Sequence, residues 1–237
     1  MARLLMKNAS HIVTCDPSDT VYTDSNLLME DGVITYIGPE EQQAEEVIDA
    51  AGCIVYPGLI NTHHHLYQTF SRNLPQVQNL ELFDWLKALY EIWKNLDSQV
   101  IYHSSVTGMG ELMKNGCTTC FDHHYVFPRD GGDLIAAQFE AAGLIGMRMH
   151  ASRGSMDLSK KDGGLPPDSV VQTIDEIMKD SVRLIEKYHD PSKGSMRQIA
   201  LAPCSPFSVS GELLRESATL ARQYGVRLHT HLCETKD

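Results

Sequence analysis

Apolar positions in residues 4–57 fall in short runs separated by turn residues, a pattern typical of strands. The runs lie at residues 4–6, 12–14, 26–29, 33–38 and 47–50. Asp31-Gly32 stands between the third and fourth runs, and Asp-Gly between two apolar runs is a strong hairpin signal. We therefore predict a small, sandwich-like β domain over residues 1–56.

From residue 53 onward, apolar strands alternate with stretches of helical periodicity. Strands are predicted at residues 54–60, 117–121, 146–151, 199–202 and 226–232. Helices are predicted at residues 81–94, 97–114, 133–142, 168–188 and 211–224. Asp168 is expected to cap the fourth helix, and Gly225 to close the fifth. Apolar strands in this alternation indicate parallel β/α units.

Both a doubly wound sheet and a (β/α)8 barrel fit this order of elements. No glycine-rich phosphate loop follows the first strand, which disfavours a dinucleotide-binding sheet. A barrel carries its active site at the C-terminal ends of its strands. Residues able to do chemistry gather at those predicted ends: His63, His65, His123, His124, His150, Cys204 and His231. We therefore predict an α/β fold in which residues 57–237 form the first five units of an incomplete TIM (β/α)8 barrel.

Five strands are too few to close such a barrel, which needs eight strands and about 250 residues. The chain is expected to be the N-terminal part of a longer protein that supplies the C-terminal units. The alternatives are strands contributed by another chain and a free-standing half barrel that dimerises.

Composition narrows the class of partner. A net charge of −11 argues against a large nucleic-acid footprint and against binding to anionic membranes. No apolar run approaches the ~18 residues of a membrane helix, and the first seven residues are too short for a signal peptide. The six cysteines suit reduced thiols, with a structural role for Cys117 and Cys120. We expect a cytoplasmic protein that acts on a small molecule.

The triplet His63-His64-His65 ends the first predicted barrel strand. Side chains alternate along a strand, so His63 and His65 point to one face and His64 to the other. Two imidazoles one pleat apart can chelate a divalent metal ion. A solvated polar strand end is the alternative, but we favour a metal site.

His231 and Glu234 end the fifth predicted strand. Alternation puts His229 and His231 on the same face, with His231 nearer the mouth of the barrel. Glu234 can fold back over the metal, take a proton from water and deliver it to a leaving amine. Alone, this spacing is weak evidence, because a loop glutamate is more often a surface residue. Together with His63 and His65 it predicts three metal ligands and a catalytic Glu234.

Two segments resemble motifs of the amidohydrolase superfamily. Residues 57–65, PGLINTHHH, resemble its first-strand motif, and residues 229–235, HTHLCET, resemble its fifth-strand motif in the deaminase branch. Within that branch the chain is most similar to the 8-oxoguanine deaminases, which are grouped with the hydroxydechloroatrazine ethylaminohydrolases. The stretches that carry this similarity are residues 65–73, 82–86, 153–156, 163–169 and 201–208.

The resemblance implies one zinc or iron(II) ion, zinc being the first candidate. Its ligands would be two first-strand histidines, a fifth-strand histidine, a sixth-strand histidine and an eighth-strand aspartate. His63, His65 and His231 match the first three, and the last two have no counterpart in this sequence. The fourth strand ends without the lysine that bridges two metals in other members, which implies a single ion.

The resemblance also implies a reaction: hydrolytic deamination of an amino-substituted heterocycle, in first place 8-oxoguanine, with release of ammonia. A pterin, a cytosine or a triazine is the alternative substrate. A non-catalytic scaffold that has lost its metal is a further alternative, which the intact ligand set disfavours. The full-length protein is expected to be a homo-oligomer.

Four residues are candidates for substrate contact, each with a plainer alternative. Gln68 could hydrogen-bond a heterocycle or be an ordinary surface residue. Trp85 could stack on the ring, although packing is favoured. Arg153 could bind a ring carbonyl or be solvated, and His123, like His124, could shape the pocket or belong to the core. The loop 153–168 is predicted to act as a lid.

Overall fold

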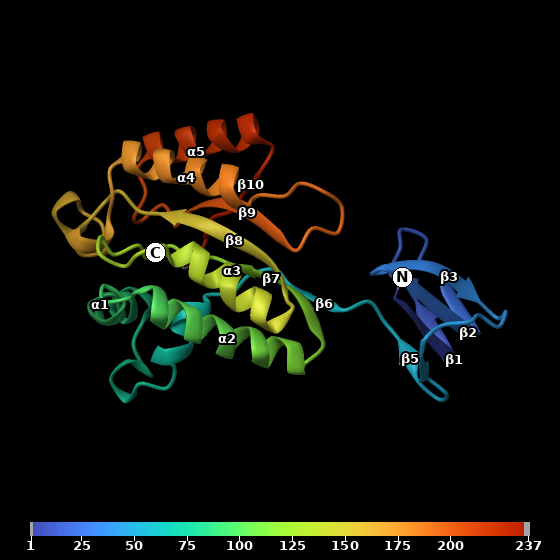
Figure 1. Ribbon diagram of the computed structural model, residues 1–237. Helices are drawn as coiled ribbons and strands as arrows, with labels where there is room; N and C mark the ends of the chain where they lie inside the picture. Colours follow the sequence, from blue (N-terminus) through green and yellow to red (C-terminus); the bar gives the residue numbers. More distant parts are fainter. Residues whose placement is uncertain (1, 235–237) are drawn as a thin grey trace. The chain divides into compact units, whose positions relative to one another are not determined.

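The computed structural model describes residues 2–234 and divides the chain into two compact units, Met1–Gly58 and Leu59–Asp237 (Figure 1). No helix among the described residues is long and apolar enough to cross a bilayer.

The N-terminal unit is a single mixed sheet of five strands. These are β1 (Arg3–Val13), β2 (Val21–Glu30), β3 (Val33–Gly38), β4 (Glu46–Asp49) and β5 (Ile54–Val55). β1, β2 and β3 are antiparallel neighbours, whereas β4 and β5 pair in parallel with the two ends of β1. The predicted β unit is therefore confirmed.

Turn chemistry explains the strand order of this unit. Asp31 and Gly32 both have positive φ, 50° and 82°, and they join β2 to β3 as the hairpin signal predicts. The two predicted runs 4–6 and 12–14 belong to one strand, β1. Its pairing with β2 shifts between Met6 and Ala9, around Asn8 at φ 63°, so a bulge interrupts the apolar pattern there.

The second unit is built on a parallel sheet of five strands in the order β10-β9-β8-β7-β6. They are β6 (Leu59–Asn61), β7 (Cys117–Asp122), β8 (Arg148–Ser155), β9 (Arg197–Pro203) and β10 (Arg227–Leu228). Each strand pairs with its neighbour in the chain, which is the strand order of a barrel and not of a doubly wound sheet. The predicted series of parallel barrel units is confirmed.

Helices cover one side of this sheet, as Figure 1 shows. They are α2 (Ser98–Lys114), α3 (Leu134–Ile145), α4 (Ile174–Tyr188) and α5 (Gly211–Tyr224). α1 (Leu82–Trp93) lies in the connection between β6 and α2 and is not one of them. Short 3-10 helices lie in the connections: η1 (Leu66–Ser71), η2 (Pro75–Val77), η3 (Lys160–Asp162) and η4 (Asp168–Val170). The side of the sheet that packs on these helices is called the outer face, and the opposite side the inner face.

Alternation along β8 separates the two faces. Met149 and Ala151 are fully buried in the core on the outer face. Arg148 and His150 line a cavity on the inner face, together with Phe121 of β7 and Arg227 of β10. Every second side chain of these strands therefore points toward the inner face.

Four predicted boundaries were wrong. The predicted strand 54–60 is divided at residues 56–58: β5 belongs to the first unit and β6 to the second. α4 begins after Thr173, whose hydroxyl forms a capping box with Glu176, while Asp168 opens η4 instead. The third strand continues to Ser155, four residues beyond the predicted end. The fifth ends at Leu228, although His229 and His231 still donate backbone hydrogen bonds to β9 and the residue after it.

Candidate metal centre

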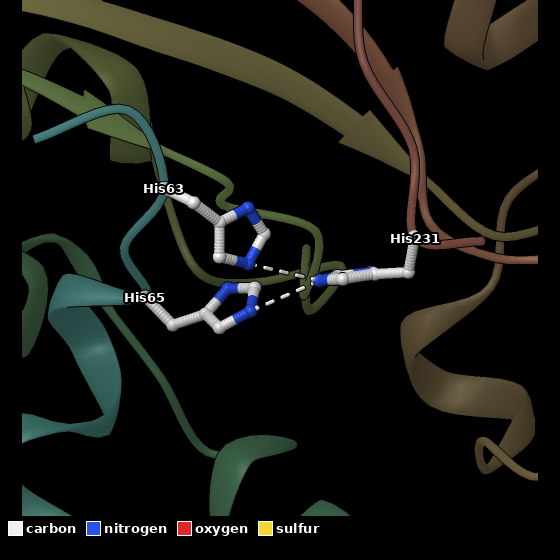
Figure 2. A group of neighbouring side chains, drawn as sticks. All are labelled: His63, His65 and His231. Atoms are coloured by element: carbon white, nitrogen blue, oxygen red, sulfur yellow. Dashed lines mark hydrogen bonds between the residues drawn. The ribbon is translucent and has the colours of Figure 1, made fainter. Parts of the chain in front are cut away.

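Three histidines that follow the two edge strands of the parallel sheet meet on its inner face (Figure 2). His63 and His65 follow β6, and His231 follows β10. The Nε2 atom of His231 lies 3.1 Å from Nε2 of His65 and 3.3 Å from Nε2 of His63. The structure thus brings together residues that are 166 and 168 positions apart in the chain.

Backbone carbonyls orient two of these rings. Nδ1 of His65 lies 2.7 Å from the carbonyl of His123, and Nδ1 of His231 lies 2.8 Å from the carbonyl of Cys204. A carbonyl only accepts hydrogen bonds, so each Nδ1 carries the proton and each Nε2 keeps a free lone pair. This tautomer is the one in which Nε2 can bind a metal ion.

The rings of His63 and His65 are also neutral near pH 7. Burial and, to a smaller extent, the neighbouring histidines lower the pKa of His63 to about 4. Burial likewise lowers the pKa of His65 to about 3, against the hydrogen bond to His123, which raises it. Metal binding requires the unprotonated imidazole, so no proton has to be removed from either ring near pH 7.

The spacing of the donor atoms fits a zinc ion. Nitrogens held ~2.0–2.1 Å from a tetrahedral zinc lie roughly 3.3 Å apart, close to the two measured separations. Lone pairs that face one another at this distance repel unless a cation lies between them. The cluster can therefore hold a metal ion.

Two further histidines surround this group. The ring of His123 stacks on His231 with 4.2 Å between centroids, and Nε2 of His229 lies 2.9 Å from Nδ1 of His63. His63, His123 and His229 form a second, overlapping set of possible ligands. His229 was not singled out from the sequence, although it stands two residues before His231 on the same face. His64 belongs to neither set, as alternation predicts.

A pocket opens beside the cluster and contains the predicted acid–base residue. Glu234 is exposed and lines this pocket together with His65 and His231. Trp85 and Gln68 also line it, and contact of either with a substrate stays a prediction. His123 is not part of the lining; it is fully buried behind His231.

Cys204, which was predicted at the end of the fourth strand, also lines the pocket. The other residues of the pocket wall were not singled out as site residues from the sequence; they are Leu82, Leu86, Tyr90, Tyr125, Leu165, Ser205, Phe207 and Ser208. Leu165 comes from the loop that was predicted to be a lid. This loop is tied down within itself, since the backbone N–H of Gly164 donates to the carbonyl of Ser159 at 2.8 Å. Apolar residues in a loop carry no signal that distinguishes a pocket wall from ordinary packing.

The structure contradicts the predicted substrate contact through Arg153. Arg153 lies on β8 and points to the outer face, where only 1% of its surface is exposed. Its Nε donates to Asp180 and its Nη2 to Gln172, both at 2.7 Å, and its guanidinium lies 4.1 Å from the ring centre of Phe127. The predicted position of His150 at a strand end is also wrong, because His150 lies within β8 and not at its C-terminal end.

Comparison with known proteins agrees with this geometry. The model of the amidohydrolase family matches residues 54–237. The chain is 44% identical to an 8-oxoguanine deaminase of Pseudomonas aeruginosa, over 100% of this chain and 53% of that protein. It is 40% identical to a hydroxydechloroatrazine ethylaminohydrolase of Pseudomonas sp. strain ADP, over 99% and 52%.

A solved structure shows the same fold. It is an atrazine chlorohydrolase from Arthrobacter aurescens TC1 complexed with zinc, which superposes with a TM-score of 0.92 at 32% identity. The match covers 97% of this chain and 52% of that one. The chain thus spans about half the length of the relatives it matches.

Proposed function

The chain belongs to the amidohydrolase family, and we propose that it carries the metal centre of a deaminase that acts on an amino-substituted heterocycle, with 8-oxoguanine as the first candidate. His63, His65 and His231 would hold one divalent ion, zinc in first place and iron(II) in second. The observation that carries the proposal is the convergence of three Nε2 atoms beside a pocket that contains Glu234.

The pocket favours a flat, polar-edged ring. Trp85 offers an aromatic surface, and Leu82, Leu86 and Phe207 line the pocket with apolar side chains. Gln68 carries both a donor and an acceptor on one amide, which suits the alternating donors and acceptors of a heterocycle edge. The 44% identity to an 8-oxoguanine deaminase supports a purine as the first candidate.

A divalent ion in this position supplies the Lewis acidity that makes water nucleophilic near neutral pH. The remaining steps fall to residues of the chain. Glu234 would move two protons: the first from the attacking water to the ring nitrogen, which keeps it, and the second from the added hydroxyl to the amine. The C–N bond then breaks, a ring carbonyl forms and the amine leaves as ammonia. Gln68 would orient the ring, and the apolar wall would exclude competing water.

A triazine is the second candidate substrate, favoured by the 40% identity to a hydroxydechloroatrazine ethylaminohydrolase. A pterin and cytosine remain as further alternatives. Homo-oligomerisation of the full-length protein and a cytoplasmic location also stay predictions.

Product release from a panel of heterocycles tests the proposed reaction. The zinc-loaded protein is incubated with 8-oxoguanine, a pterin, cytosine and a hydroxylated ethylaminotriazine, and ammonia or ethylamine is measured. We expect ammonia from 8-oxoguanine at the highest kcat/KM. The matched control is Glu234→Gln, which keeps the shape and is expected to lower kcat by ~10²–10⁴.

Metal analysis separates an enzyme from a scaffold. A protein that binds less than about half an equivalent of zinc or iron contradicts the metal centre and favours the non-catalytic alternative. Full zinc loading with ammonia released only from the pterin or cytosine, or with ethylamine released only from the triazine, keeps the metal centre and rejects 8-oxoguanine.

A further inference from the structure

Asp122, the last residue of β7, is a buried carboxylate directly behind the metal centre. Its exposed fraction is 0%. Oδ1 accepts the backbone N–H of Leu66 at 2.6 Å, and Oδ2 accepts the side-chain amide of Gln138 from α3. Leu66 is the residue after His65 and the first of η1, whose N-cap His65 offers no side-chain hydrogen bond. Asp122 therefore meets a helix-terminal donor that would otherwise be unpaired.

The next residue of the chain binds the same segment twice more. The backbone N–H of His123 donates to the carbonyl of His64 at 2.7 Å, and the carbonyl of His123 accepts from Nδ1 of His65 at 2.7 Å. Asp122 and His123, the last residue of β7 and the one after it, thus hold residues 64, 65 and 66 by hydrogen bonds. The hydrogen bond from Asp122 to Leu66 fixes the backbone, and the one from His65 to His123 fixes the ring.

We propose that Asp122 is a positioning residue for the metal centre: through the amide of Leu66 it holds His65 so that Nε2 faces His231. This inference rests on the proposed role of His65 as a ligand. Asp122 itself does not touch the ion or the substrate.

Burial of a carboxylate argues that this position serves more than packing. The pKa of Asp122 is raised to about 7, because the effect of burial exceeds the opposite effect of the hydrogen bonds from Leu66 and Gln138. A carboxylate removed from water is costly, and an apolar side chain would fill the same space without that cost. Loss of a residue that orients a metal ligand typically lowers the metal affinity by about 10–100-fold.

Zinc affinity of the full chain, measured by competition with a chromophoric chelator, tests the proposal. Asp122→Ala removes both hydrogen bonds and is expected to weaken zinc binding by about 10–100-fold. Asp122→Asn keeps an oxygen for the Leu66 amide and is expected to weaken it by less than about tenfold. The Oε1 atom of Gln138, which has no partner among the described residues, can accept from the new amide.

Cobalt(II) gives a readout that a purely structural role would not move. The visible absorption bands of the bound ion report its ligand geometry, so Asp122→Ala should shift them while Asp122→Asn should leave them close to the parent. Asp157→Ala is the matched control. The Asp157 carboxylate also accepts a backbone N–H, that of Ser210 at 2.7 Å, but it belongs to neither histidine set. We expect this control to lose stability and keep its zinc affinity.

Several results would overturn the inference. They are an unchanged zinc affinity in Asp122→Ala, an equal loss in Asp122→Asn, which would indicate the charge and not the position, and an equal loss in Asp157→Ala. If Asp122→Ala does not fold, Gln138→Ala tests the same hydrogen-bonded pair, and an unchanged affinity and cobalt spectrum would count against the role. A parent protein that binds no zinc would contradict the proposed metal centre itself, and this role with it.

Discussion

Two clusters of polar side chains lie on opposite faces of the same parallel sheet, the outer one buried and the inner one partly exposed, and they differ in how far their hydrogen bonds are satisfied. On the outer face, Arg153 donates to Asp180, Gln172 and the carbonyl of Gly154. On the inner face, His63, His65 and His231 turn Nε2 atoms toward one another with no counter-charge between them.

The difference separates structure from function. The outer cluster is satisfied within the chain, because each of the three guanidinium nitrogens donates to an acceptor. The inner cluster consists of lone pairs that face one another and therefore needs a cation to be stable. We infer that changes in the outer cluster act on stability, whereas changes in the inner cluster act on metal binding.

The largest effect is expected from His231→Ala. It removes one of three ligands, so zinc affinity should fall by more than ~100-fold, the upper figure for loss of an orienting partner. Stability without metal should fall by only about 1–2 kcal/mol, because the substitution removes the hydrogen bond from Nδ1 to Cys204 and the stacking on His123 but no favourable contact among the Nε2 atoms. Calorimetric titration with zinc and urea unfolding in chelator measure the two quantities. A large loss of stability in chelator would show that the inner cluster also stabilises the fold, and the proposed difference between the two clusters would be wrong.

Arg153→Ala should do the reverse. It leaves a cavity in the core and removes one of two cationic partners of Asp180, which is 28% exposed and keeps Arg183, so the expected cost is about 2 kcal/mol. Zinc affinity and KM should stay at the parent values, since Arg153 points away from the pocket. Urea unfolding and the zinc titration report both. If KM rose while stability held, the original prediction of a substrate contact would be restored.

Stability in chelator should fall as the pH drops from 7 to 5. The pKa of His65 and that of His124 are both about 3 in the fold, chiefly because of burial, so below their usual value of 6.5 the unfolded chain binds more protons. Asp122 opposes this, because its pKa is raised to about 7 and the folded state binds its proton. His63, whose pKa is about 4, adds to the loss, so three histidines against one aspartate leave roughly 1–2 kcal/mol per pH unit.

Urea unfolding at pH 5, 6 and 7 measures this slope. Asp122→Asn should steepen it, since the opposing carboxyl is gone. A slope of zero or of the opposite sign would show that the buried histidines do not control acid stability.

The smallest effect is expected from Gln68→Ala. Loss of one or two hydrogen bonds to a neutral ring is worth about 1 kcal/mol, so KM should rise by roughly 3–10-fold with zinc affinity unchanged. Steady-state kinetics on 8-oxoguanine tests it. Gln68→Glu, of similar size, is a useful companion, because it keeps the acceptor and loses the donor. Unchanged kcat and KM in both variants would show that Gln68 does not contact the substrate.

Local chemistry was enough to predict the elements that depend on it. α5 occupies the predicted residues 211–224 and ends at Gly225, whose φ of 66° is the left-handed conformation that closes a helix. The β2–β3 hairpin follows from Asp31-Gly32 in the same way. Strand ends were harder, because the length of β8 depends on neighbours that are distant in sequence. Its early predicted end at residue 151 made Arg153 a loop residue, although period-two alternation from His150 puts it on the outer face.

The chain's own pattern of residues sufficed to identify the parallel units, the spacing of His63 and His65, and the match of His231 and Glu234 to them, since these depend on short-range periodicity. Only the folded sheet shows that His123 stacks on His231, that His229 meets His63, and that Asp122 holds Leu66. Such contacts join residues 56 or more positions apart or depend on which face a strand turns inward, and strand pairing across the whole unit sets both.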